Sequence, residues 1–165
     1  MDNNPAETLD ELWYKYKPKI YNYFRIQFDE STAEDLCQQT FMNAWRYISI
    51  HAGCVRNSKS WLFSVAKNVK NDHLRYVQLH QMNYSYDDLY EKDIPVETNI
   101  DESISFQKAF EKLSEEEKQL LSMAQYLKSR EIGSVLGISA SAVRNRIQKA
   151  KQHLNSALND FDIHI

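Results

Sequence analysis

The sequence contains few of the residues that interrupt regular structure. Only three glycines and three prolines occur among its 165 residues. Apolar residues recur with the helical period almost throughout the chain, and no segment competes as a strand. These features predict an all-α protein.

Cysteines and long apolar runs are scarce as well. The two cysteines, Cys37 and Cys54, cannot form a disulfide framework, and so low a number fits a reducing cytosol. His51 and Cys54 have the spacing of a ligand pair, but no second pair accompanies them, so we expect no metal site and no other cofactor. The sequence has no run of ~18 apolar residues and no signal-peptide pattern. It therefore predicts a cytoplasmic protein without direct membrane insertion.

Residue patterns typical of an enzyme are also missing. The acidic residues and the five histidines are scattered along the chain, and no nucleophile is paired with a base. No glycine-rich loop that could hold a phosphate is present. We therefore predict that the protein is not an enzyme.

The N-terminal part, residues 1–80, predicts one compact helical domain. Helices are expected at about 6–28, 33–48 and 60–79, each with an apolar stripe that complements the others. The second helix is expected to begin with the capping box Ser31–Glu34. We expect Cys37 and Trp45 on the buried side of this helix, and Tyr76 on the buried side of the third helix.

Composition changes sharply after the third helix. Between residues 83 and 105, seven carboxylates accompany a single lysine, Lys92, and Pro95 lies in the middle. No sustained period is present, so residues 81–106 are predicted to form a flexible acidic linker. A capping box from Ser114 to Glu117 then begins the helices of a second small domain, residues 107–165.

The segment from Arg130 to Leu154 predicts a helix-turn-helix. Gly137 is expected to end a short helix as a left-handed residue, and Ser139 to cap the next helix. Six Lys and Arg residues but one carboxylate lie between Lys128 and Leu154, in a chain whose net charge is −3. This concentration favours DNA binding over a merely solvated helix face. The side chains expected to contact DNA are Ser141, Arg144, Asn145, Gln148 and Lys149.

The third predicted helix carries a second basic face, opposite its buried stripe. Phe63, Lys67 and Lys70 are expected to be exposed there. Lysines that contact phosphates, together with a ring on which an unstacked base can stack, suit single-stranded nucleic acid. Taken alone, this helix could instead carry a solvated basic face with one exposed Phe and no role in nucleic-acid binding.

Three motifs occur in order along the chain: AEDLCQQTFMNAW at 33–45, SWLFSVAKNVKNDHLR at 60–75, and LSEEEKQLL followed by REIGSVLGISASAVRNRIQKAK. In this order they resemble the extracytoplasmic-function sigma factors, the small two-domain initiation subunits of bacterial RNA polymerase. They cover nearly the whole chain, with an unlike linker where the family is variable. A stand-alone helix-turn-helix transcriptional regulator is the alternative, but it leaves the second and third helices unexplained.

The resemblance implies binding to core RNA polymerase and to promoter DNA, and it allows an anti-sigma factor as a further partner. It implies polymerase docking through Asp35, Gln38, Gln39 and Phe41, with Gln39 standing where the family usually has Glu. It implies recognition of the minus-ten element, as a melted strand, through Lys59, Trp61, Phe63, Lys67, Asn68, Lys70 and Asn71. The five DNA-contacting residues of the helix-turn-helix would read the minus-thirty-five element as duplex.

Overall fold

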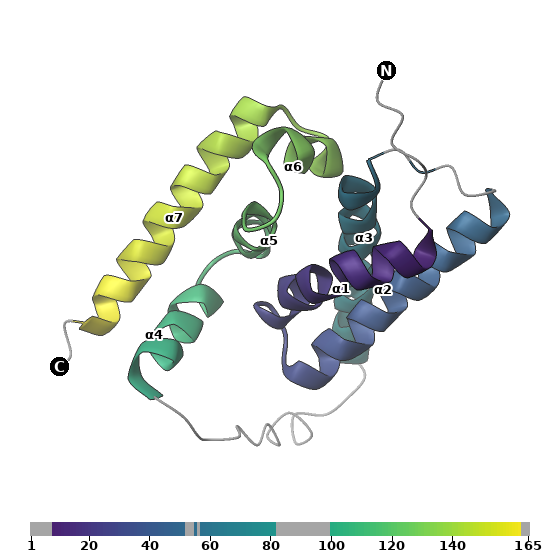
Figure 1. Cartoon of the computed structure of the whole chain (residues 1–165). Coiled ribbons are helices and arrows are strands. Elements are labelled where there is room, and N and C mark those ends of the chain that lie inside the picture. The colour runs from purple at the N-terminus through teal and green to yellow at the C-terminus, as the bar shows by residue number, and fades with distance from the viewer. Residues whose placement is uncertain (1–7, 52–54, 56, 82–99, 163–165) are drawn as a thin grey trace.

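The computed structural model describes residues 8–51, 55, 57–81 and 100–162 of the chain. Within these ranges all regular structure is α-helical, as the sequence predicts. The helices are α1 (Leu9–Arg25), α2 (Glu30–Ile50), α3 (Ser58–Gln81), α4 (Ile100–Glu111), α5 (Glu115–Ala124), α6 (Ser129–Leu136) and α7 (Ala140–Asp162). Figure 1 shows α1–α3 gathered on one side and α4–α7 on the other. None of the described helices combines the length and the apolar character that crossing a bilayer requires.

Side-chain caps set the first residues of α1 and α2. Thr8 and Glu11 form a reciprocal capping box, in which the Glu11 carboxylate accepts a hydrogen bond from the Thr8 N–H at 2.8 Å. Asp29 caps α2 by accepting a hydrogen bond from the Thr32 N–H at 3.3 Å. The predicted capping box at Ser31 is therefore wrong. The helix begins earlier because the Asp29 carboxylate already satisfies a free N–H of the first turn.

The N-terminal helices pack around an apolar core, with α1 against α2 and α3. Ile20 and Phe24 of α1 are completely buried. Cys37 is buried as predicted, and burial raises the pKa of its thiol to about 11. Trp45 and Tyr76, which were predicted to be buried, are 55 % and 58 % exposed. The apolar arcs of α2 and α3 are wider than the faces that their neighbours cover.

The C-terminal helices pack around α7, which contacts α4, α5 and α6. The predicted capping box at the start of α5 is confirmed: Ser114 Oγ accepts from the Glu117 N–H at 3.2 Å, and Glu117 accepts from the Ser114 N–H at 3.1 Å. The helical structure starts at Ile100, inside the range predicted to be a linker, because α4 packs on α7. The remainder of that predicted linker, 82–99, lies outside the described residues.

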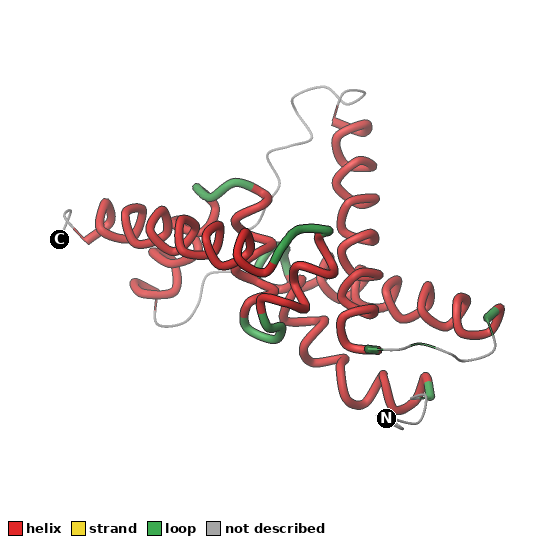
Figure 2. The backbone as a smooth tube through the Cα atoms, turned by 90° about the horizontal axis from the view of Figure 1, so that it is seen from above, coloured by secondary structure: helices red, strands yellow, loops and turns green. Residues whose placement is uncertain are grey.

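The two groups of helices pack against each other. Helix α6 contacts α3, and buried residues of both groups form one continuous apolar cluster that runs from Leu12 in α1 to Val143 in α7. In Figure 2, seen from above, helices of both groups meet at the centre of the molecule. The C-terminal helices therefore lie on a face of the N-terminal domain that the sequence alone left open.

Candidate nucleic-acid interface

The turn between α6 and α7 has the predicted geometry. Gly137 adopts a left-handed conformation, with φ 71° and ψ 32°, and the Gly133 carbonyl accepts hydrogen bonds from the backbone N–H groups of Gly137 and Ile138. Ser139 then caps α7, since its Oγ accepts from the Ala142 N–H at 3.1 Å. These contacts fix the direction in which α7 leaves the turn.

Gly133, inside α6, is a residue that the sequence reasoning missed. A Cβ at this position would lie 2.5 Å from the Ile138 carbonyl oxygen, closer than real Cβ contacts allow. A glycine inside a short amphipathic helix is unfavourable for helix formation, so its presence signals a close backbone approach. Here the absence of a side chain lets the turn fold tightly back onto α6.

Helix α7 presents one buried and one open side. Val143 and Ala150 are fully buried against the other C-terminal helices. The five residues predicted to contact the minus-thirty-five element all lie exposed on α7: Ser141, Arg144, Asn145, Gln148 and Lys149. Arg146 and His153 point elsewhere, because they contact Glu116 and Glu117 of α5. The open side of the helix therefore offers amides and cations to solvent.

The face of α3 that was predicted to bind a melted strand is not open. Phe63 is completely buried, between Tyr23 of α1 at 5.7 Å and Tyr126 at 6.1 Å between ring centroids. Lys70 is 1 % exposed. The expected exposure of both residues is wrong, because α3 is covered on two sides: by α1 and α2, and by the C-terminal helices.

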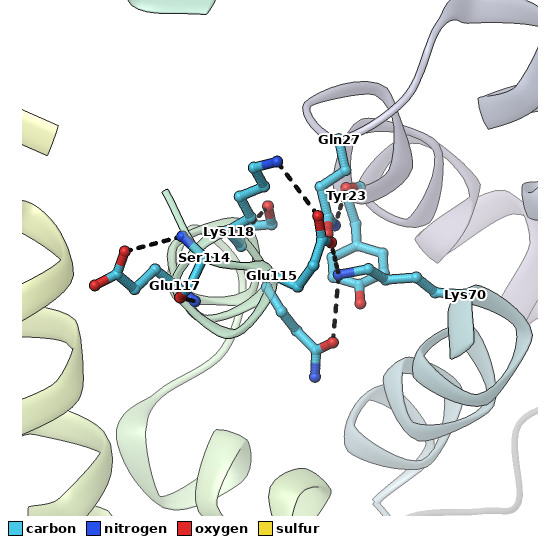
Figure 3. Close-up of polar contacts among 9 residues, drawn as sticks. Tyr23, Gln27, Lys70, Ser114, Glu115, Glu117 and Lys118 are labelled. Atoms are coloured by element: carbon cyan, nitrogen blue, oxygen red, sulfur yellow. Dashed lines mark hydrogen bonds and ion pairs between the residues drawn. The ribbon is translucent and has the colours of Figure 1, made fainter. Parts of the chain in front are cut away.

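Lys70 is held at the start of α5 by polar partners (Figure 3). Its Nζ lies 3.7 Å from a carboxylate oxygen of Glu115 and donates a hydrogen bond to Gln119 Oε1 at 3.4 Å. Burial lowers the pKa of Lys70 to about 8, although the nearby Glu115 carboxylate opposes this shift. A second cation, Lys118, lies within reach of the same carboxylate at 3.3 Å.

Two further lysines of the predicted strand-binding set also contact the C-terminal helices. Lys67 Nζ donates to the Val135 carbonyl of α6 at 3.0 Å. Lys59 forms an ion pair with Glu131 of α6 at 3.2 Å, and Ser60 Oγ donates to the same carboxylate at 3.4 Å. Partial burial favours the neutral form of Glu131, but hydrogen bonds from Lys128 and Lys59 outweigh it and lower the carboxyl pKa.

The remaining residues of that set lie at the margins of the covered face. Asn68 and Asn71 are exposed, and Trp61 is half-buried. Trp61 lies 5.3 Å from the ring of Tyr47, which stacks on His51 at 4.2 Å. The sequence reasoning did not single out this aromatic group at the end of α2. Cys54, which was considered as a metal-ligand partner of His51, lies outside the described residues.

The residues predicted to dock on polymerase lie along α2. Asp35, Gln38 and Gln39 are exposed, whereas Phe41 is only 4 % exposed and packs edge-on against Trp13 at 4.9 Å. Phe41 nevertheless lines an open groove between α1 and α2. The other lining residues include Trp13, Tyr14, Gln38, Met42 and Trp45. Tyr14, Met42 and Trp45 are among the large apolar side chains that remain exposed.

Two parts of the chain match parts of one protein family. Residues 12–79 match region 2 of the sigma-70 proteins, and residues 103–154 match their region 4. The first range contains α2 and nearly all of α3, and the second contains the helix-turn-helix. The N-terminal match accounts for the helices that a stand-alone helix-turn-helix regulator leaves unexplained.

Two bacterial sigma factors are similar to the chain in sequence. The chain is 25% identical to the ECF RNA polymerase sigma factor SigL of Mycobacterium tuberculosis over 164 residues, which cover 96% of this chain and 93% of SigL. It is 41% identical to SigM of Bacillus subtilis over 69 residues, or 41% of each chain.

The fold is that of a solved relative as well. The sigma factor RpoE of Bartonella quintana, crystallised with the anti-sigma factor NepR, superposes with a TM-score of 0.73 at 19% identity, covering 91% of this chain and 96% of RpoE. Sigma factors of this kind are transcription initiation factors without catalytic activity. The chain therefore belongs to the sigma-70 family, as an extracytoplasmic-function sigma factor that directs RNA polymerase to promoters.

Proposed function

We propose that the chain reads promoters at two places while bound to core RNA polymerase in the cytoplasm. Helix α7 would read the minus-thirty-five element as duplex DNA. Helix α3, with the segment before it, would bind the minus-ten element as a melted strand. No chemical step is assigned to the chain itself.

The observation that carries the proposal is the exposed polar side of α7. Arg144 and Asn145 can each make two hydrogen bonds to a base edge in the major groove, and Lys149 can contact a phosphate. The apolar side of α7 is fixed against the rest of its domain, so the reading side chains are carried by a rigid element.

Polymerase docking is proposed for α2 and its groove. Asp35, Gln38 and Gln39 supply exposed polar contacts, and the groove supplies apolar anchors such as Trp45. Aromatic anchors beside a polar rim are typical of protein interfaces. We also propose an anti-sigma partner for this chain, as in the solved RpoE–NepR complex.

Each DNA contact is expected to be weak alone. The overall charge is −3, so the positive side chains form only local patches. Affinity for free DNA should fall steeply as the salt concentration rises, because releasing condensed counterions into a saltier solution gains less free energy. Polymerase would hold both domains on one promoter, so that the second contact forms at a high effective concentration.

Run-off transcription with core polymerase tests the reading role of α7. Arg144→Ala and Asn145→Ala should each reduce promoter-specific transcription, since a bidentate base contact is worth about 1–3 kcal/mol of discrimination. Association with core polymerase should not change. The matched control is Asn155→Ala, which removes an exposed side chain from the same helix roughly 15 Å further along. Normal transcription by both variants would show that α7 does not read the promoter.

A further inference from the structure

We propose that the exposed face of α2 binds the same face of a second copy of the chain, in an antiparallel dimer with two-fold symmetry. The residues of this face, all of them exposed, are Asp35, Gln38, Gln39, Met42, Trp45 and Arg46. Polymerase docking is proposed for the same face, so polymerase would have to displace the second copy. That displacement rests on the proposed function, whereas the dimer itself does not.

The outer face of α2 is open to solvent. Helix α2 packs on α1 and α3 through its opposite side, where Cys37 and Ala44 are buried. Figure 1 shows α2 on the side of the molecule away from α7. Met42 and Trp45 remain exposed beside Tyr14 of α1, which is 83% exposed, and the three side chains line one groove. Large apolar side chains that cluster on a surface mark a site for another molecule.

The charges along α2 have an order that is complementary to itself. Asp35 and Arg46 are 11 positions apart, which is about three helical turns, so both lie on the same side of the helix. The residues between them, from Leu36 to Trp45, carry no charge. In an antiparallel pair of helices centred between positions 40 and 41, Asp35 of each copy lies opposite Arg46 of the other. The symmetry therefore forms two ion pairs at once.

The centre of this face suits a two-fold axis. A residue near such an axis lies close to its own copy, so a charge there would meet a like charge. Gln38 and Gln39 are neutral amides that both donate and accept hydrogen bonds, and Met42 supplies an apolar contact at the same level. A parallel pair of helices would instead set Asp35 against Asp35 and Arg46 against Arg46. The charge order thus favours the antiparallel arrangement.

The dimer is expected to be weak and reversible. A contact made by one helix and its groove buries less surface than a permanent dimer requires, and exposed ion pairs contribute little each. The dimer therefore forms when the chain is abundant relative to polymerase. It dissociates when polymerase occupies the face of α2.

Two charge-reversal variants test the geometry in the absence of polymerase. Sedimentation velocity of the full chain should show a monomer–dimer equilibrium that depends on concentration. Asp35→Arg sets cations opposite each other and Arg46→Asp sets anions opposite each other, so each variant alone should raise the dissociation constant of the dimer by roughly tenfold or more. A mixture of the two variants should dimerise again, because each substituted position then faces a side chain of opposite charge.

Glu111→Arg on α4 is the matched control, since it makes the same change of charge at an exposed position away from α2. It should dimerise like wild type. Circular dichroism should show equal helical content in every variant, because all three positions are exposed. Three results would overturn the proposal: a wild-type chain that is monomeric at every concentration, dimers that both reversals leave intact, and folded variants that stay monomeric when mixed.

Addition of core polymerase tests whether the dimer and polymerase use the same face. Resonance energy transfer between copies that carry donor and acceptor dyes at their N-termini should fall as polymerase is added. Energy transfer that persists while the chain is bound to polymerase would place the dimer contact elsewhere and overturn the proposal. Failure of the proposed docking has a different signature: the mixture of variants dimerises as expected, but Trp45→Ala binds polymerase like wild type.

Discussion

Lys70 is a cation in surroundings that favour its neutral form. Its folded-state pKa is about 8, below the ordinary 10.5, mainly because burial removes water from the ammonium. Below pH 8 both folded and unfolded chains carry the proton, and folding bears the full cost of burying the charge. Between pH 8 and 10.5 the folded chain has lost a proton that the unfolded chain retains. Raising the pH through this window therefore stabilises the folded chain.

Lys70→Met is expected to stabilise the chain at pH 7. The substitution removes a buried charge and leaves Glu115 largely in water, so a gain of about 1–3 kcal/mol in the free energy of unfolding is expected. Urea unfolding at pH 7 and pH 9 provides the measurement. The advantage of the variant over wild type should shrink at pH 9. Lys118→Met, at the other cation beside Glu115, is the control, and an equal response from both variants would contradict this account of Lys70.

At the scale of the helices, α2 combines two kinds of contact that can be separated by substitution. Trp45→Ala should weaken association with core polymerase by roughly tenfold or more, as expected for an exposed aromatic anchor. Asp35→Lys should also weaken association with core polymerase, because it reverses the charge of an exposed side chain. Neither change should lower helical content, because both side chains are exposed. Binding to core polymerase, measured without DNA, is the test.

The control for α2 is Glu111→Lys on α4, an exposed carboxylate outside the groove. The Glu111→Lys variant should bind polymerase with the affinity of wild type. If Trp45→Ala and Asp35→Lys also bind normally, polymerase does not dock on this face of α2.

The two helices proposed to bind DNA differ in how far their surfaces could be predicted. One side of α7 is buried within its own domain, so the period of Val143 and Ala150 was enough to identify the opposite, exposed side. The same reasoning was wrong for α3, because its second covering comes from helices beyond a linker. Lys70 and Glu115 lie 45 positions apart, and no local pattern reports such a contact.

Contacts within one domain were therefore more predictable than contacts across the linker, although Trp45 and Tyr76 show that an apolar stripe can be wider than the face its neighbours cover. The capping box at Ser114 was predicted from local chemistry and is confirmed. The predicted first residue of α2 was wrong, because Asp29 caps an additional helical turn that lies before the apolar stripe. Gly133 was missed for a related reason, since the atom that it approaches belongs to the turn after its own helix.

At the scale of the whole molecule, the continuous apolar cluster predicts cooperative unfolding of the two domains. Trp13, Trp45 and Trp61, the three tryptophans, all lie in the N-terminal domain, so tryptophan fluorescence reports that domain. Circular dichroism reports the helices of both. The two denaturation curves of wild type should coincide, as for a single transition.

Tyr126→Ala should separate the two curves, because it removes a side chain that joins the domains without belonging to the N-terminal core. Leu121→Ala, at a half-buried position of α5, serves as a comparison in which the C-terminal domain is weakened internally. Curves that already diverge in wild type would contradict the coupling of the domains.

If α3 binds melted strands as proposed, the packing of α6 over α3 also limits which nucleic acids the free chain can bind. Replication forks, repair gaps and nascent transcripts all present phosphates and unstacked bases, and an open row of lysines would bind them regardless of sequence. With Lys59 and Lys67 held by α6, such decoys meet mainly the neutral amides of Asn68 and Asn71. This packing would leave more of the unbound chain free of unrelated single strands and available to bind polymerase.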